Sequence, residues 1–410
     1  ASSWGQGRLL TGLSPSSSLS GFTAVITKAN LPASALDTGS LSCLNGGGDW
    51  RFSTDINGAT QLPCEIVTCV TNASAGNTEF EAWIRFPTYA SGTRSVYAFW
   101  NKAGESQPLV SATFGRNAVW QDKSAFWHGN SLTDVTGNGS DLVVSGTASV
   151  NNIVDGYRSY TSDASGEFGY INGTETFSTS EACTITKWFK RTSNVSGNDF
   201  KQQLTFISNS FGGDGFAIAV KQSGSLTVFT NGGNTLSSNT SITALNTWYK
   251  IDVIFDQANN QILFYINGSL DLTVTSYSDN SAGGETGSID HDVAGSSRDQ
   301  GWRVGATSAN QISSEYANQD NPSTFWAGGT VFVPGGGGAT YSITLAAGSY
   351  AYTGNDLALK ADRKLSFDAG SYNYTGNAKD LLVGRKLAFD AGSYSYVGND
   401  VGLKANRKLS

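Results

Sequence analysis

The residues best suited to chemistry gather in one polar stretch, residues 276–302. Its carboxylates predict a calcium site, because hard cations bind oxygen ligands. The predicted calcium ligands are Glu285, Asp290 and Asp292, and the predicted ligand-binding residues are Tyr277, Asp279, Asn280 and Trp302. The spacing matches no recognised cation loop, and Ser, Gly and Asp are also typical of a solvated loop, so that interpretation stays open. Trp302 also fits a core position at the start of a strand. Calcium is the one cofactor that the sequence suggests.

Two other sets of polar residues are weaker candidates. His128 needs an acid or nucleophile partner to act in catalysis, and the sequence identifies none, so a structural imidazole beside Trp127 is favoured. A second set lacks an accompanying histidine, so ion pairs and turn caps are favoured over a metal or carboxylate-pair site. Its members are Asp49, Arg51, Asp55 and Glu65.

The cysteines are predicted to be free, buried thiols. Cys43, Cys64, Cys69 and Cys183 have no paired short spacing and no histidine ligand pattern, so neither a zinc site nor a disulfide framework is expected. Cys64 and Cys69 are an odd number of residues apart. On one continuous strand they would point to opposite faces and could not pair.

Composition favours an all-β protein of two or three domains. Among 410 residues, 49 are Gly, 11% are aromatic and 14% are charged, and helical periodicity is almost absent. A net charge of −7 argues against a nucleic acid partner. The sequence shows no transmembrane run and no leader, so we expect a mature soluble product without membrane insertion.

Three consecutive antiparallel strands are predicted within Trp248–Val274. Apolar residues alternate there with Lys250 and Asp252, which predicts one apolar face and one wet face. Asn267-Gly268 suits the tight turn of the second hairpin.

Residues 1–114 hold short alternating strands that predict an N-terminal β-sandwich-like domain. The segments GGGDWRFSTDINGATQLPCEI, EFEAWIRFP and RSVYAFWNKAG resemble an uncharacterised β-rich domain of prokaryotic and phage surface proteins. The resemblance implies no defined activity.

Residues 115–315 resemble a laminin-G-like or concanavalin A-like jelly roll. Trp120, Trp127, His128 and Asp134 match the segment that leads into such a domain, and GFAIAV, WYKIDVIFD, FYINGSL and WRVGA follow its strand order. The resemblance implies a sandwich whose loops are free to bind ligands. Glycoside hydrolases of this fold carry paired carboxylates in an ExDxE strand motif, and the sequence contains none. We therefore expect no enzymatic activity.

Residues 316–339 predict a Gly-rich linker, and residues 340–410 are tandem 22-residue β repeats. Tyr350, Tyr372 and Tyr394 recur in step. One unit cannot bury its own face, so units are expected to stack on one another or on neighbouring chains. The units resemble repeats of phage tail and other virion proteins.

These patterns predict two β-sandwich (jelly-roll) domains in tandem, followed by a β-repeat segment. The function they indicate is that of a non-enzymatic phage virion protein, a tail fibre or capsid decoration, whose lectin-like sandwich attaches the virion surface to glycans. Expected partners are further copies of the chain, with a homotrimer as the starting expectation, other virion proteins and a cell-surface glycan. The alternatives are a secreted bacterial cell-surface adhesin and a glycan-active enzyme with an unrecognised site.

Overall fold

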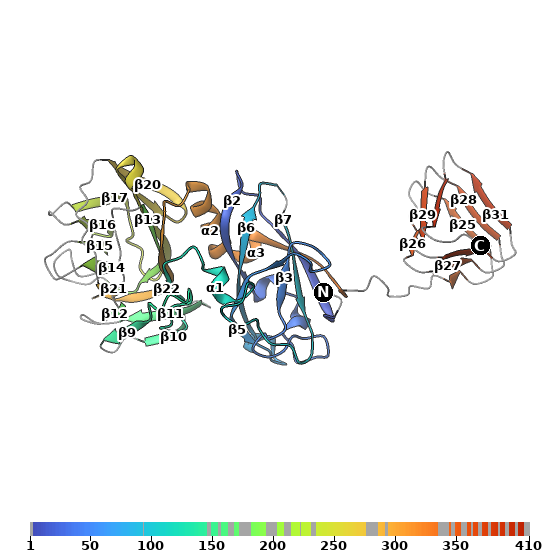
Figure 1. Ribbon diagram of the computed structural model, residues 1–410, viewed down its shortest axis with the longest axis horizontal. Coiled ribbons are helices and arrows are strands. Elements are labelled where there is room, and N and C mark those ends of the chain that lie inside the picture. The colour runs from blue at the N-terminus through green and yellow to red at the C-terminus, as the bar shows by residue number, and fades with distance from the viewer. Residues whose placement is uncertain are drawn as a thin grey trace. The chain divides into compact units, whose positions relative to one another are not determined.

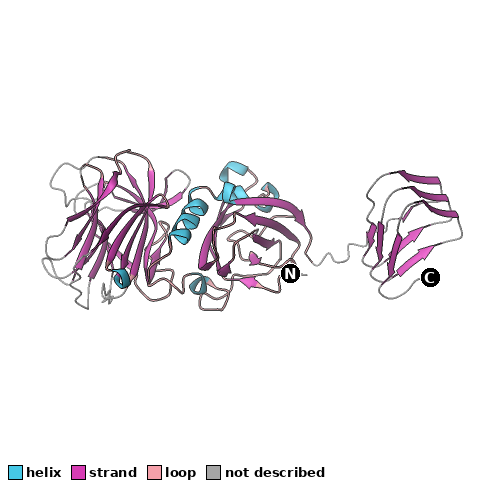
Figure 2. Cartoon of the chain, turned by 90° about the horizontal axis from the view of Figure 1, so that it is seen from above, coloured by secondary structure: helices cyan, strands magenta, loops and turns pink. Residues whose placement is uncertain are grey.

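The computed structural model describes residues 3–334 with gaps, followed by the strands within residues 344–405 (Figure 1). The gaps are 93, 146–148, 155–156, 163–167, 172–181, 194–202, 209–214, 222, 231–234, 276–285 and 292–293. The chain divides into two compact units, of which Gly5–Val331 is one and Phe332–Ser410 with Ala1–Trp4 is the other. The predicted all-β class is confirmed, since the described elements are strands with a few short helices (Figure 2).

Two antiparallel sheets form the first sandwich of the larger unit. The five-stranded sheet has the order β23-β1-β7-β3-β4, with β23 (Trp326–Phe332), β1 (Gln6–Gly12), β7 (Arg94–Trp100), β3 (Arg51–Ser53) and β4 (Gln61–Leu62). The three-stranded sheet has the order β2-β6-β5, with β2 (Leu19–Thr27), β6 (Glu79–Tyr89) and β5 (Cys64–Val70). Side chains alternate across β6, so Phe80, Ala82, Ile84 and Phe86 face the shared core.

A bulge in β5 changes the expected orientation of two cysteines. Cys64 lies opposite Ile84 and Cys69 lies opposite Phe80, because the register shifts between Ile66 and Thr68. An extra residue moves every later side chain to the other face. Both thiols therefore join the same core, and the prediction of opposite faces is wrong because it assumed a continuous strand.

Residues 316–332 are ordered elements of the first sandwich, although the sequence analysis assigned them to a linker. Helix α2 (Ala309–Asp320) begins where the Ser308 side chain accepts a hydrogen bond from the backbone of Gln311. Helix α3 (Pro322–Phe325) begins at a second cap, Asn321, with proline in its first turn. Strand β23 then pairs with β1 and completes the five-stranded sheet.

The second sandwich also consists of two sheets. The eight-stranded sheet has the order β10-β11-β22-β13-β18-β19-β20, with β8 beside β22. Its strands are β8 (Ala125–Trp127), β10 (Ser149–Val154), β11 (Tyr157–Ser162), β13 (Cys183–Arg191), β18 (Trp248–Asp256), β19 (Gln261–Ile266), β20 (Ser269–Thr275) and β22 (Gly295–Val304). The three predicted strands are thus β18, β19 and β20, and Asn267 and Gly268 both adopt positive φ in their turn.

The seven-stranded sheet covers one face of the eight-stranded sheet. Its order is β17-β16-β15-β14-β21-β12-β9. Its strands are β9 (Leu142–Ser145), β12 (Phe168–Ile171), β14 (Gln203–Ser208), β15 (Gly215–Val220), β16 (Ser225–Thr230), β17 (Thr235–Ser241) and β21 (Thr286–His291). The core between the sheets includes Ile185, Val253, Phe264 and Val228. The two predicted sandwiches are confirmed in their order along the chain.

Part of the other face of the eight-stranded sheet is also buried, where α2 packs on it. Ile312 of α2 packs on Ile254 and Tyr265, and the Trp188 indole donates a hydrogen bond to Gln319 at 2.7 Å. The predicted wet face of β18 is therefore wrong. Lys250 and Asp252 are 0% and 1% exposed, and they form an ion pair of 2.6 Å beneath the helix.

In the smaller unit, each described repeat adds one strand to each of three parallel sheets. The sheet orders are β24-β27-β30, β25-β28-β31 and β26-β29-β32. The bounds are β24 (Thr344–Leu345), β25 (Ser349–Thr353), β26 (Leu359–Ala361), β27 (Lys364–Phe367), β28 (Ser371–Thr375), β29 (Lys379–Val383), β30 (Lys386–Phe389), β31 (Ser393–Val397) and β32 (Val401–Ala405). Tyr350 lies opposite Tyr372, which lies opposite Tyr394, so the repeats stack in register as a parallel solenoid.

Truncation tests which residues complete the first sandwich. A chain that ends at Pro334 keeps β23 and the buried rings of Phe325 and Trp326, so we expect it to melt at the temperature of the same unit in the full chain. A chain that ends at Glu315 removes both rings and an edge strand. We expect it to lose the cooperative transition of the first sandwich in calorimetry. Equal melting of both fragments would contradict this assignment.

Candidate functional site

The two sandwiches of the larger unit meet around a cluster of buried aromatic and aliphatic side chains. Its members are Val25, Trp83, Val119, Trp120, Phe126 and Val135. Helix α1 (Arg116–Val119) positions Trp120, whose ring stacks on Phe126 with 4.1 Å between centroids. Trp83 of β6 lies 5.3 Å from Trp120. These rings exclude water, so electrostatic interactions between the polar groups that they surround are strong.

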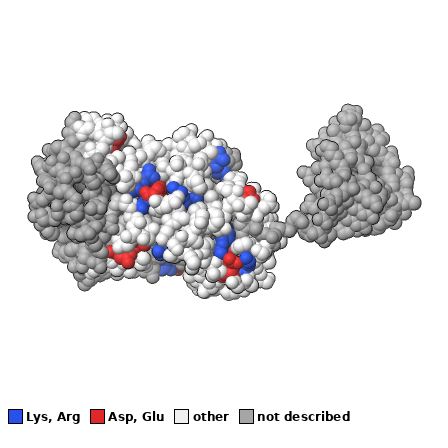
Figure 3. Space-filling view, viewed as in Figure 1, with Lys and Arg blue, Asp and Glu red and all other residues white. Residues whose placement is uncertain are grey.

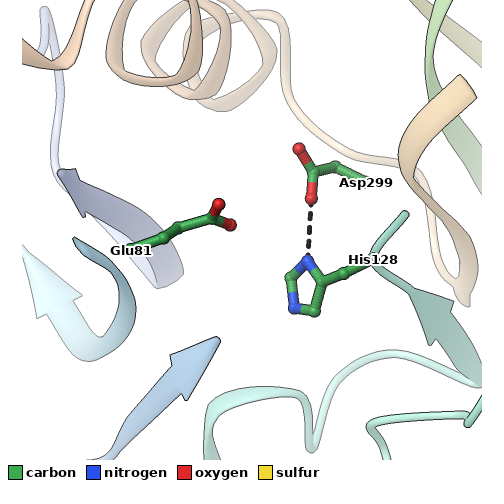
Figure 4. Close-up of side chains that lie close together, drawn as sticks. All are labelled: Glu81, His128 and Asp299. Atoms are coloured by element: carbon green, nitrogen blue, oxygen red, sulfur yellow. Dashed lines mark hydrogen bonds and ion pairs between the residues drawn. The ribbon is translucent and has the colours of Figure 1, made fainter. Parts of the chain in front are cut away.

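His128 follows β8 directly and lies within this cluster, with 4% of its surface exposed. Its Nδ1 lies 2.8 Å from Oδ1 of Asp299 (Figure 4), and its Nε2 lies 3.3 Å from Oε2 of Glu65. Glu65 belongs to β5 of the first sandwich and Asp299 to β22 of the second. One imidazole therefore joins the two sandwiches.

Neighbouring donors hold both carboxylates in place. The Trp120 indole donates to Oε2 of Glu65 at 2.5 Å, and Arg298 donates to Oδ2 of Asp299 at 2.5 Å. The Arg298 guanidinium also lies over the Trp188 ring, 4.4 Å from its centroid. The cluster is thus a connected network, in which most polar groups have partners.

The electrostatics favour a charged His128. Burial alone would lower its pKa, but the charge of Glu65 and the hydrogen bond with Asp299 outweigh burial and raise the pKa to about 10. Burial likewise acts to raise the pKa of Asp299, but His128 and Arg298 hold it below its usual value. At neutral pH the site therefore contains a histidinium between two carboxylates.

A third carboxylate lies beside this pair. Ligand atoms of Glu81, His128 and Asp299 all lie within 4.8 Å of one another, the one such group of metal-ligating side chains within the described ranges (Figure 4). The Trp83 indole donates to Glu81 at 2.8 Å, and burial together with the charge of Asp299 raises the Glu81 pKa. A metal ion here would displace the His128 proton and compete with Arg298, so the geometry fits a proton-linked network better than a metal centre.

A surface cleft of about 330 Å³ borders the junction of the two sandwiches and is lined by residues from β5 and from the segment that follows β8. Its polar lining residues are Glu65, Gln107, Arg116, Asn130, Ser131 and Thr133. Amides and hydroxyls of this kind can hydrogen-bond a neutral polar ligand. Charged side chains are sparse on the described part of the face shown in Figure 3, where they form a few small groups of mixed sign.

The structure describes only part of the segment from which ligand-binding residues were predicted. Tyr277, Asp279, Asn280, Glu285 and Asp292 lie outside the described residues. The backbone of Asp290 lies in β21, and its side chain lies outside the description.

The last part of that segment is a strand and not a loop, because residues 295–304 form β22. Trp302 is 5% exposed and packs on Trp127 with 5.3 Å between ring centroids. The prediction of Trp302 as a ligand-binding residue is therefore corrected, since its ring packs in the core of the second sandwich.

The set near the N-terminus does not form one site. Asp49 accepts hydrogen bonds from the backbone of Leu44 and Asn101, and Asp55 accepts them from the turn at Thr60. Turn capping is thus confirmed for both aspartates. The cysteines are free and buried, as predicted.

Glu65 instead joins His128, a contact that the sequence analysis missed. Both residues were considered in separate hypotheses, because they are 63 positions apart in the sequence. A burial pattern that placed Glu65 on the face of β5 opposite the core would have been the available signal.

Residues 163–288 match the family model of the concanavalin A-like lectin/glucanases superfamily. The second sandwich is thus a module of the lectin or glucanase kind, as the laminin-G-like resemblance implied. No curated protein matches the chain.

Among solved structures, the chain is similar to domain 4 of AbnA, an extracellular arabinanase from Geobacillus stearothermophilus solved with arabinotriose, with 14% identity and a TM-score of 0.39. That alignment covers 47% of this chain and 97% of the other. The chain is also similar to the ligand-binding domain of botulinum neurotoxin serotype D in complex with N-acetylneuraminic acid, with 15% identity and a TM-score of 0.37. Here it covers 48% of this chain and 51% of the toxin chain, so the match spans about half of that protein. These scores are too low to transfer a property to this chain.

The charge on His128 predicts a pH-dependent stability. Its pKa is 6.5 in the unfolded chain and about 10 in the folded one, so its contribution is complete below pH 6.5 and is lost as the pH rises towards 10. We expect His128→Gln to lower the free energy of unfolding by about 3 kcal/mol at pH 6, because it removes the cation that pairs with buried Glu65 and leaves Asp299 with Arg298 alone. Denaturant unfolding at pH 6, 8 and 10 measures the difference.

The difference between wild type and His128→Gln should shrink at each step to higher pH. Glu65→Gln serves as the comparison variant, since it keeps the bond to Asp299 and should destabilise the protein less. A difference that stays constant from pH 6 to pH 10 would show that the imidazole is neutral.

Proposed function

We propose that this chain is a non-enzymatic virion protein of a bacteriophage whose concanavalin-like sandwich binds carbohydrate on a host or environmental surface. The observation that carries the proposal is the match of residues 163–288 to the lectin/glucanase superfamily on a complete two-sheet sandwich. The chain acts from the virion surface, as a tail fibre or a capsid decoration. It assembles with further copies of itself, as a homotrimer, and with other virion proteins.

Part of one face of the eight-stranded sheet is covered by α2, which favours a ligand site at the rim of the sandwich. The outer face of β13 and β18 lies beneath α2, where Trp188 and Lys250 are buried. A sugar chain cannot lie along this face while the helix is in place. The polar segment of residues 276–292 instead follows β20 and contains β21, a strand of the sheet that α2 does not cover.

We assign the ligand contacts to this rim segment. Tyr277 stacks on a sugar ring, Asp279 and Asn280 hydrogen-bond its hydroxyls, and a calcium ion held by carboxylates orders the segment. The calcium ligands in this proposal are Glu285, Asp290 and Asp292.

Two features support binding without catalysis. The sequence lacks the ExDxE triplet that supplies acid and nucleophile in hydrolases of this fold. His128, the one histidine whose side chain is described, is held as a buried cation between carboxylates and therefore lacks the free base that catalysis needs.

The repeat unit supports a role in assembly. Its strands pair in parallel and in register from repeat to repeat, which gives an element built from identical steps. Such an element suits a structural part of a particle, and the same build also serves a secreted bacterial adhesin.

A glycan array tests the binding function. The full chain should bind a subset of glycans with calcium present, and a chelator should reduce the signal at least about tenfold, because the ion orders the rim segment. Asp290→Asn should lose binding in the same way, whereas Asp256→Asn, at the half-buried end of β18, should retain it.

Binding that survives Asp290→Asn but fails in Asn130→Ala would move the ligand to the cleft beside Glu65 and contradict the rim assignment. The absence of a binding signal on the array, both with and without calcium, would contradict the glycan-binding function itself. Release of shortened sugars from a bound glycan would instead identify an enzyme.

Immunogold labelling tests the location. An antibody to the solenoid should label purified virions at a regular position, and mass measurement of the full chain should give a trimer. Label confined to bacterial cell surfaces would favour the secreted adhesin and contradict the virion assignment.

A further inference from the structure

Two thiols of the first sandwich lie in direct contact. The sulfur atoms of Cys43 and Cys69 are 3.5 Å apart, and the two residues are 5% and 6% exposed. Both belong to the core between the two sheets. Cys69 lies on β5, and Cys43 lies in the connection that precedes β3. The bulge of β5 brings Cys69 to the core face, where this contact is made.

Hydrogen bonds hold the Cys43 segment in place. The amide of Cys43 donates to the carbonyl of Ala35 within the same connection, and the amide of Gly46 donates to the carbonyl of Cys69 on β5, each at 2.9 Å. The amide of Thr71 donates to Oδ1 of Asn45 at 3.1 Å. The Cys43 segment is thus fastened to β5 before any covalent bond is made.

A close approach of the backbones adds to this arrangement. Gly47 adopts a φ of +74°, and a Cβ atom at that position would lie 3.0 Å from Cβ of Cys69. Glycine permits this conformation and leaves the space that brings the connection onto the strand. A disulfide needs an S–S distance of about 2.05 Å, so its formation requires the two side chains to rotate until the sulfurs approach from 3.5 Å to that distance.

We propose that Cys43 and Cys69 form an intramolecular disulfide when the folded protein meets a low-molecular-weight disulfide such as oxidised glutathione. The thiolate of one cysteine attacks the small disulfide, which forms a mixed disulfide and releases one small thiolate. The second cysteine, as a thiolate, then attacks the protein sulfur of that mixed disulfide and expels the second small thiol. Two protein thiols and one small disulfide thus give one protein disulfide and two small thiols.

Chemistry and position favour Cys43 as the first nucleophile. The hydrogen bond with Cys69 outweighs burial and lowers the pKa of Cys43, which increases its thiolate fraction. Its segment is also close to solvent, since Leu41, two residues earlier, is exposed. Cys69 has the raised pKa of the pair and acts as the resolving thiol.

The other two cysteines do not compete for this bond. Cys64 interacts through its sulfur with Oε1 of Gln107 at 3.7 Å, and burial raises its pKa to about 12. Cys183 lies in the core of the second sandwich. The disulfide therefore has one connectivity, and it links the connection before β3 to β5. A link of this kind restricts the unfolded chain and stabilises the first sandwich.

Peptide mapping of the full chain tests the connectivity. The protein is incubated with oxidised glutathione under native conditions, its remaining thiols are alkylated in denaturant, and it is digested with trypsin and Glu-C. Cleavage after Arg51 and after Glu65 separates the peptides of Cys43, Cys64 and Cys69. We expect the four free thiols to fall to two, with a cross-link between the Cys43 and Cys69 peptides that disappears on reduction.

Two variants and a melting measurement complete the test. Cys69→Ser should keep its three remaining thiols free, whereas the matched variant Cys64→Ser, on the same strand, should still form the cross-link. Oxidation should raise the melting temperature of the first sandwich by roughly 5 °C in wild type and in Cys64→Ser, and not in Cys69→Ser. If Cys69→Ser does not fold, the wild-type peptide map decides alone.

Four free thiols after equilibration with the oxidant would overturn the proposal. A cross-link that includes Cys64 or Cys183, or one between two copies of the chain, would overturn it as well. So would a stable adduct of one glutathione on Cys43, since it would show that Cys69 cannot reach the mixed disulfide.

Discussion

A histidinium between two carboxylates from different sandwiches is the interaction on which the larger unit depends. His128 is bound to Glu65 on one side and to Asp299 on the other, in surroundings from which aromatic rings exclude water. A buried ion pair is weak support for stability when compared with an apolar core, but the loss of one partner is severe. The His128 ion pairs therefore determine how the two sandwiches are oriented against each other, and they add less to the stability of either one.

Helix α2 makes the same junction through hydrogen bonds. Asn318 satisfies both backbone groups of Val25 on β2, and Gln319, the next residue, accepts a hydrogen bond from Trp188 of the second sandwich. The side-chain amides of these two residues thus face different sandwiches, because successive side chains on a helix point about 100° apart. Helix α2 thus contacts both sandwiches through polar side chains.

Within the described chain, no helix is long and apolar enough to span a membrane.

This junction restricts where a lectin-like module can bind. The outer face of β13 and β18 is buried beneath α2, so a ligand cannot lie along that face while the helix is in place. The first sandwich and α2 therefore do more than accompany the second sandwich, because they determine which of its surfaces can reach a ligand.

The sequence by itself determined the β class, the strands at Trp248–Val274 and the repeats, because alternation and period are local properties of the chain. The second sandwich was predicted through its resemblance to laminin-G-like domains. The sequence also predicted free thiols and the turn caps at Asp49 and Asp55. It could not predict that Lys250 and Asp252 are buried, since the helix that covers them is supplied by residues 309–320. The contacts between His128 and Glu65 and between Cys43 and Cys69 depend on strand pairing, a bulge and the packing of two sandwiches. Only the tertiary structure could decide these, because they join residues that no local pattern relates.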